Sequence, residues 1–533
     1  MGTVLYLNGT IYTMDVAQPR AQAMAIDSTS GRIVAVGSDD EVRRAGGQYT
    51  ELVDLRGKTV LPGFIDAHIH LLETAYRRHR IDAVSCGSED EVAALVRARA
   101  AQTPPGQWIQ GGGWDKNLWP GAAFPTKAAL DDAAPHHPVA LWSKDGHLLW
   151  VNSLALQRAA ITAQTPNPAT GAILRDGAGE PTGVLQESAA TNLIFAVVDP
   201  PDQATSRLLL EQALADLQRS GITTIHDIEG DQSLNLFRTL QAEGKLGVRV
   251  QMILPRDVLP RIHDYGNDAN DFLHIGGIKI FADGTLGSQT AAMLESFEGH
   301  AGNYGILAIP EEEMLATVRG ASALGLMIAI HAIGDRAARV ALNSIERAQQ
   351  FLADVPTTVP INPRYRLEHV QLITAQDLER MRRLGVIASI QPFHAVADRD
   401  IAERYWGKRH RHAYAYRTMR DMGIPLALGS DAPIEIFDPL RILYAATVRS
   451  DPATQRPPWL PDQALPVPDA LWGYTLGAAY AGAEEASKGS LMVGKLGDAV
   501  VLREDIMSNP QETISANGVQ ATILGGQPVY GSL

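Results

Sequence analysis

Apolar and polar positions alternate along the chain in blocks that predict strands and helices in turn. Helix-end signals lie between the apolar runs: Thr374 with Asp377 resembles a capping box, and Gly385 stands where the same helix should end. Eight short apolar runs predict strands at 59–68, 221–227, 248–254, 277–282, 326–331, 364–369, 386–391 and 425–430. Eight strands separated by helices predict a TIM-like (β/α)8 barrel in the α/β class, with a doubly wound sheet as the alternative.

Both ends of the chain read as short strands separated by turns such as Asn8-Gly9 and Gly525-Gly526. We therefore expect residues 1–58 and 485–533 to build one small β-sandwich domain, and residues 59–484 to form the barrel domain. The long stretch from about 71 to 220 predicts a large insertion after the first barrel strand. This insertion gathers five tryptophans, which are Trp108, Trp114, Trp119, Trp142 and Trp150.

The first predicted barrel strand ends in two histidines, His68 and His70. Residues i and i+2 of a strand point to the same face, so both imidazoles aim at one place. Imidazole is a good ligand for zinc and similar ions. His410 and His412 have the same spacing in a basic stretch that predicts only a surface segment. The first pair differs because it lies at the carboxyl end of a buried strand, where parallel α/β folds place their chemistry.

Charged or polar residues also stand at the ends of later strands. They are Lys279, His331, His369 and Asp431. Each follows or interrupts an apolar run, where an unpaired charge would be costly. One buried histidine is more often a core residue than a ligand, but the carboxyl ends of barrel strands all meet at one face. We therefore expect these residues to converge with the first histidine pair.

Composition narrows the possible partners. With 46 Lys and Arg against 60 Asp and Glu, the net charge is −14, which argues against nucleic acid or an anionic membrane as partner. The single cysteine, Cys86, excludes an internal disulfide and a cysteine-cluster metal site. The sequence shows no signal peptide and no apolar run long enough to span a bilayer, so we expect a cytoplasmic protein. A homodimer remains open.

The motifs around these residues resemble those of the amidohydrolase superfamily, in particular its branch of YtcJ-like proteins and N-substituted formamide deformylases. The resemblance covers nearly the whole chain. The matching segments are 62–70 (PGFIDAHIH), 143–147 (SKDGH), 279–288 (KIFADGTLGS), 331–335 (HAIGD), 368–369 (EH), 428–433 (LGSDAP) and 494–499 (GKLGDA).

This resemblance implies a site for one or two divalent metal ions, with zinc as the expected metal. The implied ligands are His68, His70, Lys279, His331, His369 and Asp431. The first two would bind one ion, and His331 with His369 would bind a second. Lys279 would bridge both ions as a carboxylated lysine; as a free amine it would leave a mononuclear site, because an ammonium group cannot bind a cation. Asp431 would bind the first ion and act as the catalytic general base.

The implied activity is hydrolysis of a non-peptide C–N bond in a small-molecule amide, N-formyl or N-acyl compound, by metal-activated hydroxide. A deaminase or cyclic-amide hydrolase on the same site, and a non-catalytic scaffold, are the alternatives. Glu187 is a further carboxylate that could serve as a ligand or simply start a helix. The residues expected in the substrate pocket are Trp114, Asp145, His147, Asp283 and His394.

Overall fold

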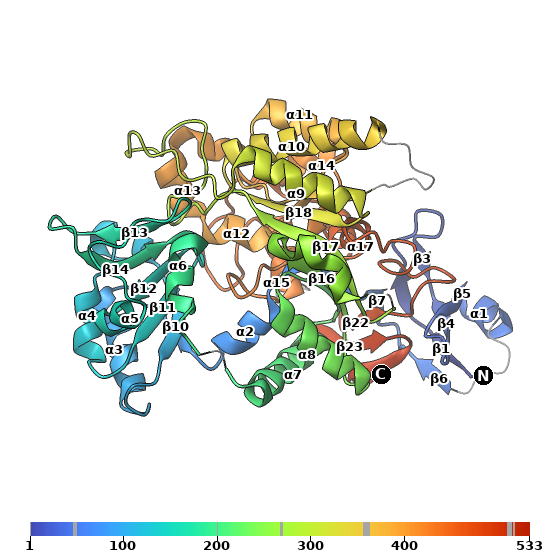
Figure 1. Ribbon diagram of the computed structural model, residues 1–533. Helices are drawn as coiled ribbons and strands as arrows, with labels where there is room; N and C mark the ends of the chain where they lie inside the picture. The colour runs from blue at the N-terminus through green and yellow to red at the C-terminus, as the bar shows by residue number, and fades with distance from the viewer. Residues whose placement is uncertain are drawn as a thin grey trace.

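The centre of the molecule is a barrel of eight parallel strands in chain order (Figure 1). The computed structural model describes residues 2–45, 51–199, 201–266, 270–354, 363–508, 514 and 518–533. The barrel strands are β8 (Phe64–Ile69), β15 (Ile222–Asp227), β16 (Arg249–Pro255), β17 (Leu273–Phe281), β18 (Met327–Ala332), β19 (Tyr365–His369), β20 (Ile387–Ile390) and β21 (Leu426–Leu428). A parallel bridge between Ile69 and Ala432 joins the first strand to the segment after the last. The predicted TIM-like barrel is confirmed.

The strand predicted at 59–68 is two strands in two different sheets. β7 (Thr59–Pro62) pairs with β2 (Thr10–Tyr12) and β22 (Ala499–Leu502), whereas β8 pairs with β15. The chain passes from one sheet to the other at Gly63, where a side chain would have its Cβ 2.2 Å from Thr223 Oγ1. The prediction of one strand was wrong because both halves are buried, so the apolar run continues through the break.

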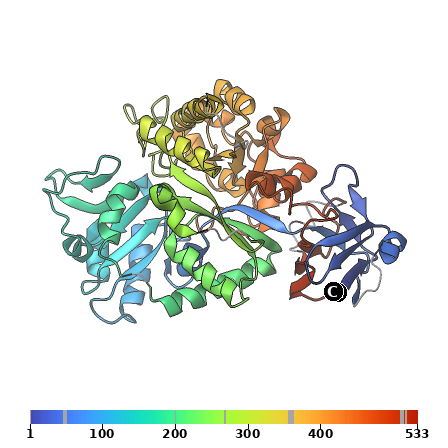
Figure 2. The ribbon, with the colours of Figure 1, turned by 45° about the vertical axis from the view of Figure 1, so that its right-hand side comes forward.

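The two ends of the chain meet in the sheet that contains β7. Its order is β24 (Gln527–Gly531), β23 (Val519–Leu524), β22, β7, β2 and β3 (Arg20–Ala21), so strands from both ends lie side by side at the right of Figure 2. A four-stranded sheet packs beside it through residues such as Tyr6 and Ile26, with helix α1 (Asp39–Ala45) at its edge. That sheet consists of β5 (Ile33–Gly37), β4 (Ala23–Asp27), β1 (Thr3–Leu7) and β6 (Glu51–Asp54). The domain boundaries at 58 and 485 stay predictions.

The segment after β8 carries a six-stranded sheet of its own, at the left of Figure 1. The sheet order is β13 (Ala172–Arg175), β14 (Pro181–Gln186), β12 (Leu148–Val151), β11 (Val139–Ser143), β10 (Ile109–Trp114) and β9 (Ile81–Asp82). Its helices are α3 (Glu89–Ala100), α4 (Lys127–Ala133), α5 (Ser153–Arg158) and α6 (Glu187–Phe195). Trp114, Trp119 and Trp150 pack together in its core. Most of the tryptophans therefore stabilise this subdomain.

Helices cover the outside of the barrel. The helices α2 (Leu71–Arg77) and α7 (Gln203–Arg219), which we had placed in the insertion, contribute Leu72 and Leu210 to the barrel core. The others are α8 (Asp231–Ala242), α9 (Glu311–Ala323), α10 (Asp335–Asp354), α11 (Ala375–Leu384), α14 (Tyr416–Asp421), α15 (Pro439–Val448), α16 (Val467–Gly473) and α17 (Leu476–Ala481). Two further helices, α12 (Pro392–Ala397) and α13 (Arg399–Trp406), line the cavity at the mouth of the barrel. The predicted caps of α11 are present: Thr374 accepts from the Asp377 amide, and Gly385 has φ 65°. Within the described ranges, no helix has the length and apolarity that crossing a bilayer requires.

The break at Gly63 gives a stability prediction. Gly63→Ala should lower the apparent melting temperature, because the added methyl group meets the buried, β-branched Thr223, and overpacking of this kind costs about 1–3 kcal/mol. Gly177→Ala is the matched control, since nothing lies within 4 Å of its added Cβ. Thermal unfolding of both variants tests the idea, and equal melting temperatures would contradict it.

Candidate metal centre

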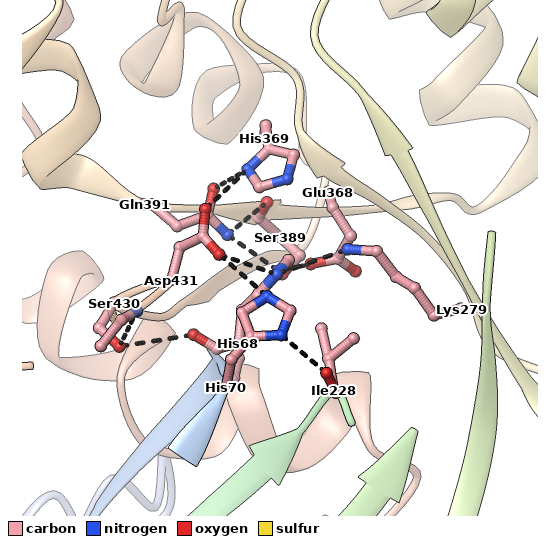
Figure 3. A network of polar contacts seen from close by, with 12 residues as sticks. His68, His70, Ile228, Lys279, Glu368, His369, Ser389, Gln391, Ser430 and Asp431 are labelled. Carbon is pink, nitrogen blue, oxygen red and sulfur yellow. Dashed lines mark hydrogen bonds and ion pairs between the residues drawn. The ribbon is translucent and has the colours of Figure 1, made fainter. Parts of the chain in front are cut away.

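The carboxyl ends of the barrel strands bring all six implied ligands to one cavity of about 740 Å³. Figure 3 shows His68, His70, Lys279, His369 and Asp431 of this set. His68 and His70 lie at and just after the end of β8, and Lys279 lies near the end of β17. His331 and His369 belong to the ends of β18 and β19, and Asp431 follows β21. Sequence reasoning placed each of these residues at a strand end, and the barrel gathers those ends.

Asp431 joins the first histidine pair into one group. Its Oδ1 lies 3.3 Å from His68 Nε2 and 3.4 Å from His70 Nε2. One ligand atom from each of the three residues lies within 4.8 Å of the others, so the group could hold a metal ion. Asp431 adopts a left-handed backbone conformation, with φ 59°, and its amide donates to the His68 carbonyl at 2.7 Å.

A second group of the same kind uses the other oxygen of Asp431. It consists of His369, His394 and Asp431, with His394 Nε2 at 3.4 Å from Asp431 Oδ2. The rings of His369 and His394 stack with centroids 5.7 Å apart. His394 lies in α12, just after the seventh barrel strand, and we had predicted it only as a substrate contact. The geometry thus adds His394 to the residues that could hold a metal.

His331 lies beside this second group but is a member of neither the first group nor the second. Its ring centroid is 4.6 Å from that of His369. Its Nε2 is 3.0 Å from the carbonyl oxygen of Gly284 and 3.4 Å from Asp283 Oδ1. Because Nε2 donates to that carbonyl, Nδ1 is the only ring nitrogen that His331 could offer to a cation.

Each histidine of the implied set has one ring nitrogen held by an oxygen acceptor. His68 Nδ1 lies 2.6 Å from Glu368 Oε2, and His70 Nδ1 lies 2.7 Å from the Ile228 carbonyl oxygen. His369 Nδ1 lies 2.8 Å from Gln391 Oε1, and the acceptor for His331 Nε2 is the Gly284 carbonyl described above. Metal-binding histidines characteristically donate their other N–H in this way, which fixes the ring and frees one lone pair. Burial, with the nearby charge of Lys279, also lowers the pKa of His68 to about 4, so its Nε2 is unprotonated at neutral pH.

Behind His68, Arg366 and Glu368 form a fully buried ion pair. Arg366 Nε donates to Glu368 Oε1 at 2.5 Å, and Arg366 Nη1 lies 3.0 Å from His226 Nδ1. Burial alone would raise the pKa of Glu368, but the charge of Arg366 holds it well below its usual range. Sequence reasoning quoted Glu368 only as part of a motif, because its contact with His68 spans 300 residues of chain.

Lys279 enters the same space from β17. Its Nζ lies 3.4 Å from His68 Nε2 and 4.9 Å from the centroid of the Phe281 ring. Burial lowers the pKa of Lys279 to about 8. More of its amine is therefore neutral near pH 7 than in an exposed lysine, and the neutral amine is the form that can react with carbon dioxide.

Three of the expected pocket residues are engaged by the protein itself. Asp145 accepts hydrogen bonds from the hydroxyls of Ser143, Thr285 and Ser288, each at 2.5 Å. Asp283 accepts from backbone amides at residues 292, 333 and 334, and Trp114 is buried with its Nε1 donating to a backbone carbonyl. Asp145 thus ties the insertion to the loop after β17.

His147 is the expected pocket residue whose ring faces the cavity from the insertion. Its Nδ1 is 2.9 Å from Glu187 Oε2, and its ring centroid lies 5.5 Å from that of His331. Burial alone would lower the pKa of His147, but the Glu187 carboxylate reverses the effect and raises it to about 9. The pocket therefore has a histidine that does not come from the barrel.

The sequence and the fold can be compared with known proteins. The model of the amidohydrolase family matches residues 51–530. The chain is 31% identical over 536 residues to the putative amidohydrolase YtcJ of Bacillus subtilis, covering 99% of both chains. It is 31% identical over 526 residues to the N-substituted formamide deformylase of Arthrobacter pascens, covering 95% of this chain and 94% of that protein. The crystal structure of an uncharacterized metal-dependent hydrolase from Pyrococcus horikoshii superposes with a TM-score of 0.76 at 26% identity, covering 96% of this chain and 99% of that one.

The geometry predicts that adding zinc to the metal-free protein increases its folding stability, and that this increase depends on His70 as a ligand. A ligand at 100 times its Kd adds about 2.7 kcal/mol to folding stability, so zinc should raise the apparent melting temperature of the wild type. His70→Ala should lose most of this gain, because it removes one donor of the first group. His412→Ala, an exposed histidine with the same His-x-His spacing, should keep the gain. An undiminished zinc effect in His70→Ala would contradict the assignment.

Proposed function

Because this chain belongs to the amidohydrolase family, we propose that it is a metal-dependent hydrolase of a non-peptide C–N bond in a small-molecule amide. The observation that carries the proposal is the carboxylate of Asp431, shared by two groups of metal-binding character above the barrel. Similarity to an N-substituted formamide deformylase favours N-formyl and N-acyl compounds among the amides. The cavity of about 740 Å³ also suits a small molecule, since ligand pockets typically measure about 300–1,000 Å³.

The donor set fits a divalent cation. His68, His70 and Asp431 would hold one ion, and His369, His394 and Asp431 would hold a second. Lys279, whose Nζ lies 3.4 Å from His68 Nε2, would add a ligand oxygen as a carbamate. Imidazole and carboxylate donors suit zinc, which we propose as the metal. With a divalent cation bound, these residues would have hydroxide available at neutral pH and a means to polarise a carbonyl group.

Asp431 is the residue we assign to proton transfer. Burial alone would raise the pKa of its carboxyl, but the surrounding histidines, His68 first among them, hold that pKa well below its usual range. The group is therefore ionised at neutral pH, which is the form that a proton acceptor requires, and we assign it to take a proton from the attacking water and deliver it to the leaving nitrogen. His70 Nε2 and His394 Nε2 lie 3.4 Å from its Oδ1 and its Oδ2, respectively.

The substrate would lie between the barrel and the insertion. On the insertion side, Trp142 and Phe195 stack at 5.1 Å and line the cavity as an apolar wall. His147 faces the reacting end from the same side, and we assign it to hydrogen bonding with the amide. Asp145 holds this part of the insertion against the barrel loop, which keeps His147 in place.

A hydrolysis screen of the zinc-loaded protein tests the function. The panel should contain N-formyl amines, N-acyl amines, cyclic amides, aminopurines and esters. Turnover of open-chain amides that a chelator abolishes would support the proposal. Preference for cyclic amides or for deamination would replace it with another activity of the same site. Absence of both bound metal and chelator-sensitive turnover would favour a non-catalytic scaffold.

Asp431→Asn should lower kcat/KM by about 10³-fold or more, because it removes the proton acceptor while keeping nearly the same shape. Metal content and the apparent melting temperature should be measured alongside, so that loss of metal is separated from loss of the base. Asp462→Asn, on the exposed surface, is the control. Activity within tenfold of wild type in the metal-loaded variant would refute the assignment.

A carbamate on Lys279 should give a carbon NMR signal when the zinc-loaded protein is equilibrated with ¹³C-bicarbonate. Lys279→Met should lose this signal, because it keeps the side-chain length and removes the amine. Lys116→Met is the control, since Lys116 is also a buried lysine but contacts no histidine of the metal groups. A wild-type spectrum without the signal would leave Lys279 as a free amine.

A further inference from the structure

One histidine of the cavity comes from the insertion. His68, His70, His331, His369 and His394 come from the barrel, whereas His147 lies in the turn between β11 and β12. Its ring meets that of His331 at 5.5 Å with a tilt of 35°. The insertion therefore reaches the part of the site where His331 and His369 lie.

Glu187 holds His147 by two contacts. The antiparallel pairing of β12 with β14 sets Leu148 opposite Gln186, the last residue of β14, so Glu187 at the start of α6 lies beside His147. The Glu187 amide donates to the His147 carbonyl at 2.9 Å, and Glu187 Oε2 accepts from His147 Nδ1 at 2.9 Å. The Glu187 side chain is buried and stands behind the ring, outside the lining of the cavity.

This arrangement is costly for folding. Glu187 has φ 64°, a conformation that non-glycine residues adopt at a cost of about 1 kcal/mol or more. Its Oε1 is buried without a hydrogen-bond partner among the described residues. That oxygen packs against Gly284, where an added Cβ would lie 2.2 Å away, and the Gly284 carbonyl holds His331. A glycine at position 187 would adopt this φ without strain and would bury no carboxylate. Folding stability alone therefore does not account for a glutamate at this position.

We propose that Glu187 is a positioning residue for the reaction. It fixes the His147 ring through Nδ1, which leaves Nε2 as the nitrogen that exchanges a hydrogen bond with the reacting amide beside His331. A carboxylate behind a histidine sets the ring orientation in the same way in other hydrolytic sites. The inference rests on the proposed hydrolase function and adds that the insertion completes the active site.

A double-mutant cycle tests this role. Glu187→Gln keeps the size of the side chain and removes the carboxylate, so kcat should fall by about 10- to 100-fold with little change in KM. His147→Ala should lower kcat at least as much, and adding Glu187→Gln to it should have no further effect, because Glu187 acts through His147. Glu187→Asp should recover part of the loss. Metal content should stay at the wild-type level, and Glu180→Gln, an exposed acid of the insertion, is the control.

Several outcomes would overturn the role. They are activity of Glu187→Gln within threefold of wild type, independent effects that multiply in the double variant, or loss of bound metal, which would make Glu187 a ligand. If Glu187→Gln does not fold, Glu187→Asp carries the same comparison.

A crystal structure separates failure of this inference from failure of the proposed function. If the wild type hydrolyses nothing in the screen, the function has failed. The positioning role then stands or falls on whether the His147 ring turns away from its wild-type orientation in zinc-loaded Glu187→Gln. An unmoved ring would refute it.

Discussion

The buried carboxylate of Asp431 is the constraint on which the rest of the structure depends. A charge buried in a barrel mouth is costly unless it is paired or bound to a metal ion, and the side chains that face Asp431 are His68, His70, His369 and His394. The same residue helps to close the barrel, because its amide donates to the His68 carbonyl next to the bridge between β8 and the chain after β21. Closure of the fold and assembly of the site therefore use the same contacts.

Three residues around the site have strained backbone conformations. His369, Asp431 and Glu187 all have positive φ values, at 73°, 59° and 64°. Such conformations persist only where the surroundings hold them, and here the surroundings are buried hydrogen bonds to the rings and carboxylates of the site. The ion pair of Arg366 with Glu368 belongs to this support, because it keeps a carboxylate aimed at His68 from inside the barrel.

The insertion is part of the site as well as a cover for it. Asp145 binds hydroxyls of the loop after β17, and Glu187 packs against Gly284 in the same loop. The Asp145 contacts are part-buried and the Glu187 contact is buried, so the subdomain is held against the barrel by more than exposed pairs.

The sequence by itself predicted the barrel, which the structure confirms, and the family, which the match over residues 51–530 confirms. It also placed the candidate ligands at strand ends. Side-chain direction repeats along a strand, so periodicity reveals elements and their ends. Only the tertiary structure decided that the chain changes sheets at Gly63, that His394 joins His369 and Asp431, and that Glu187 stands behind His147. These facts depend on distances between segments far apart in the chain, and a local pattern of apolar and polar positions carries no information about which distant segment will lie beside it.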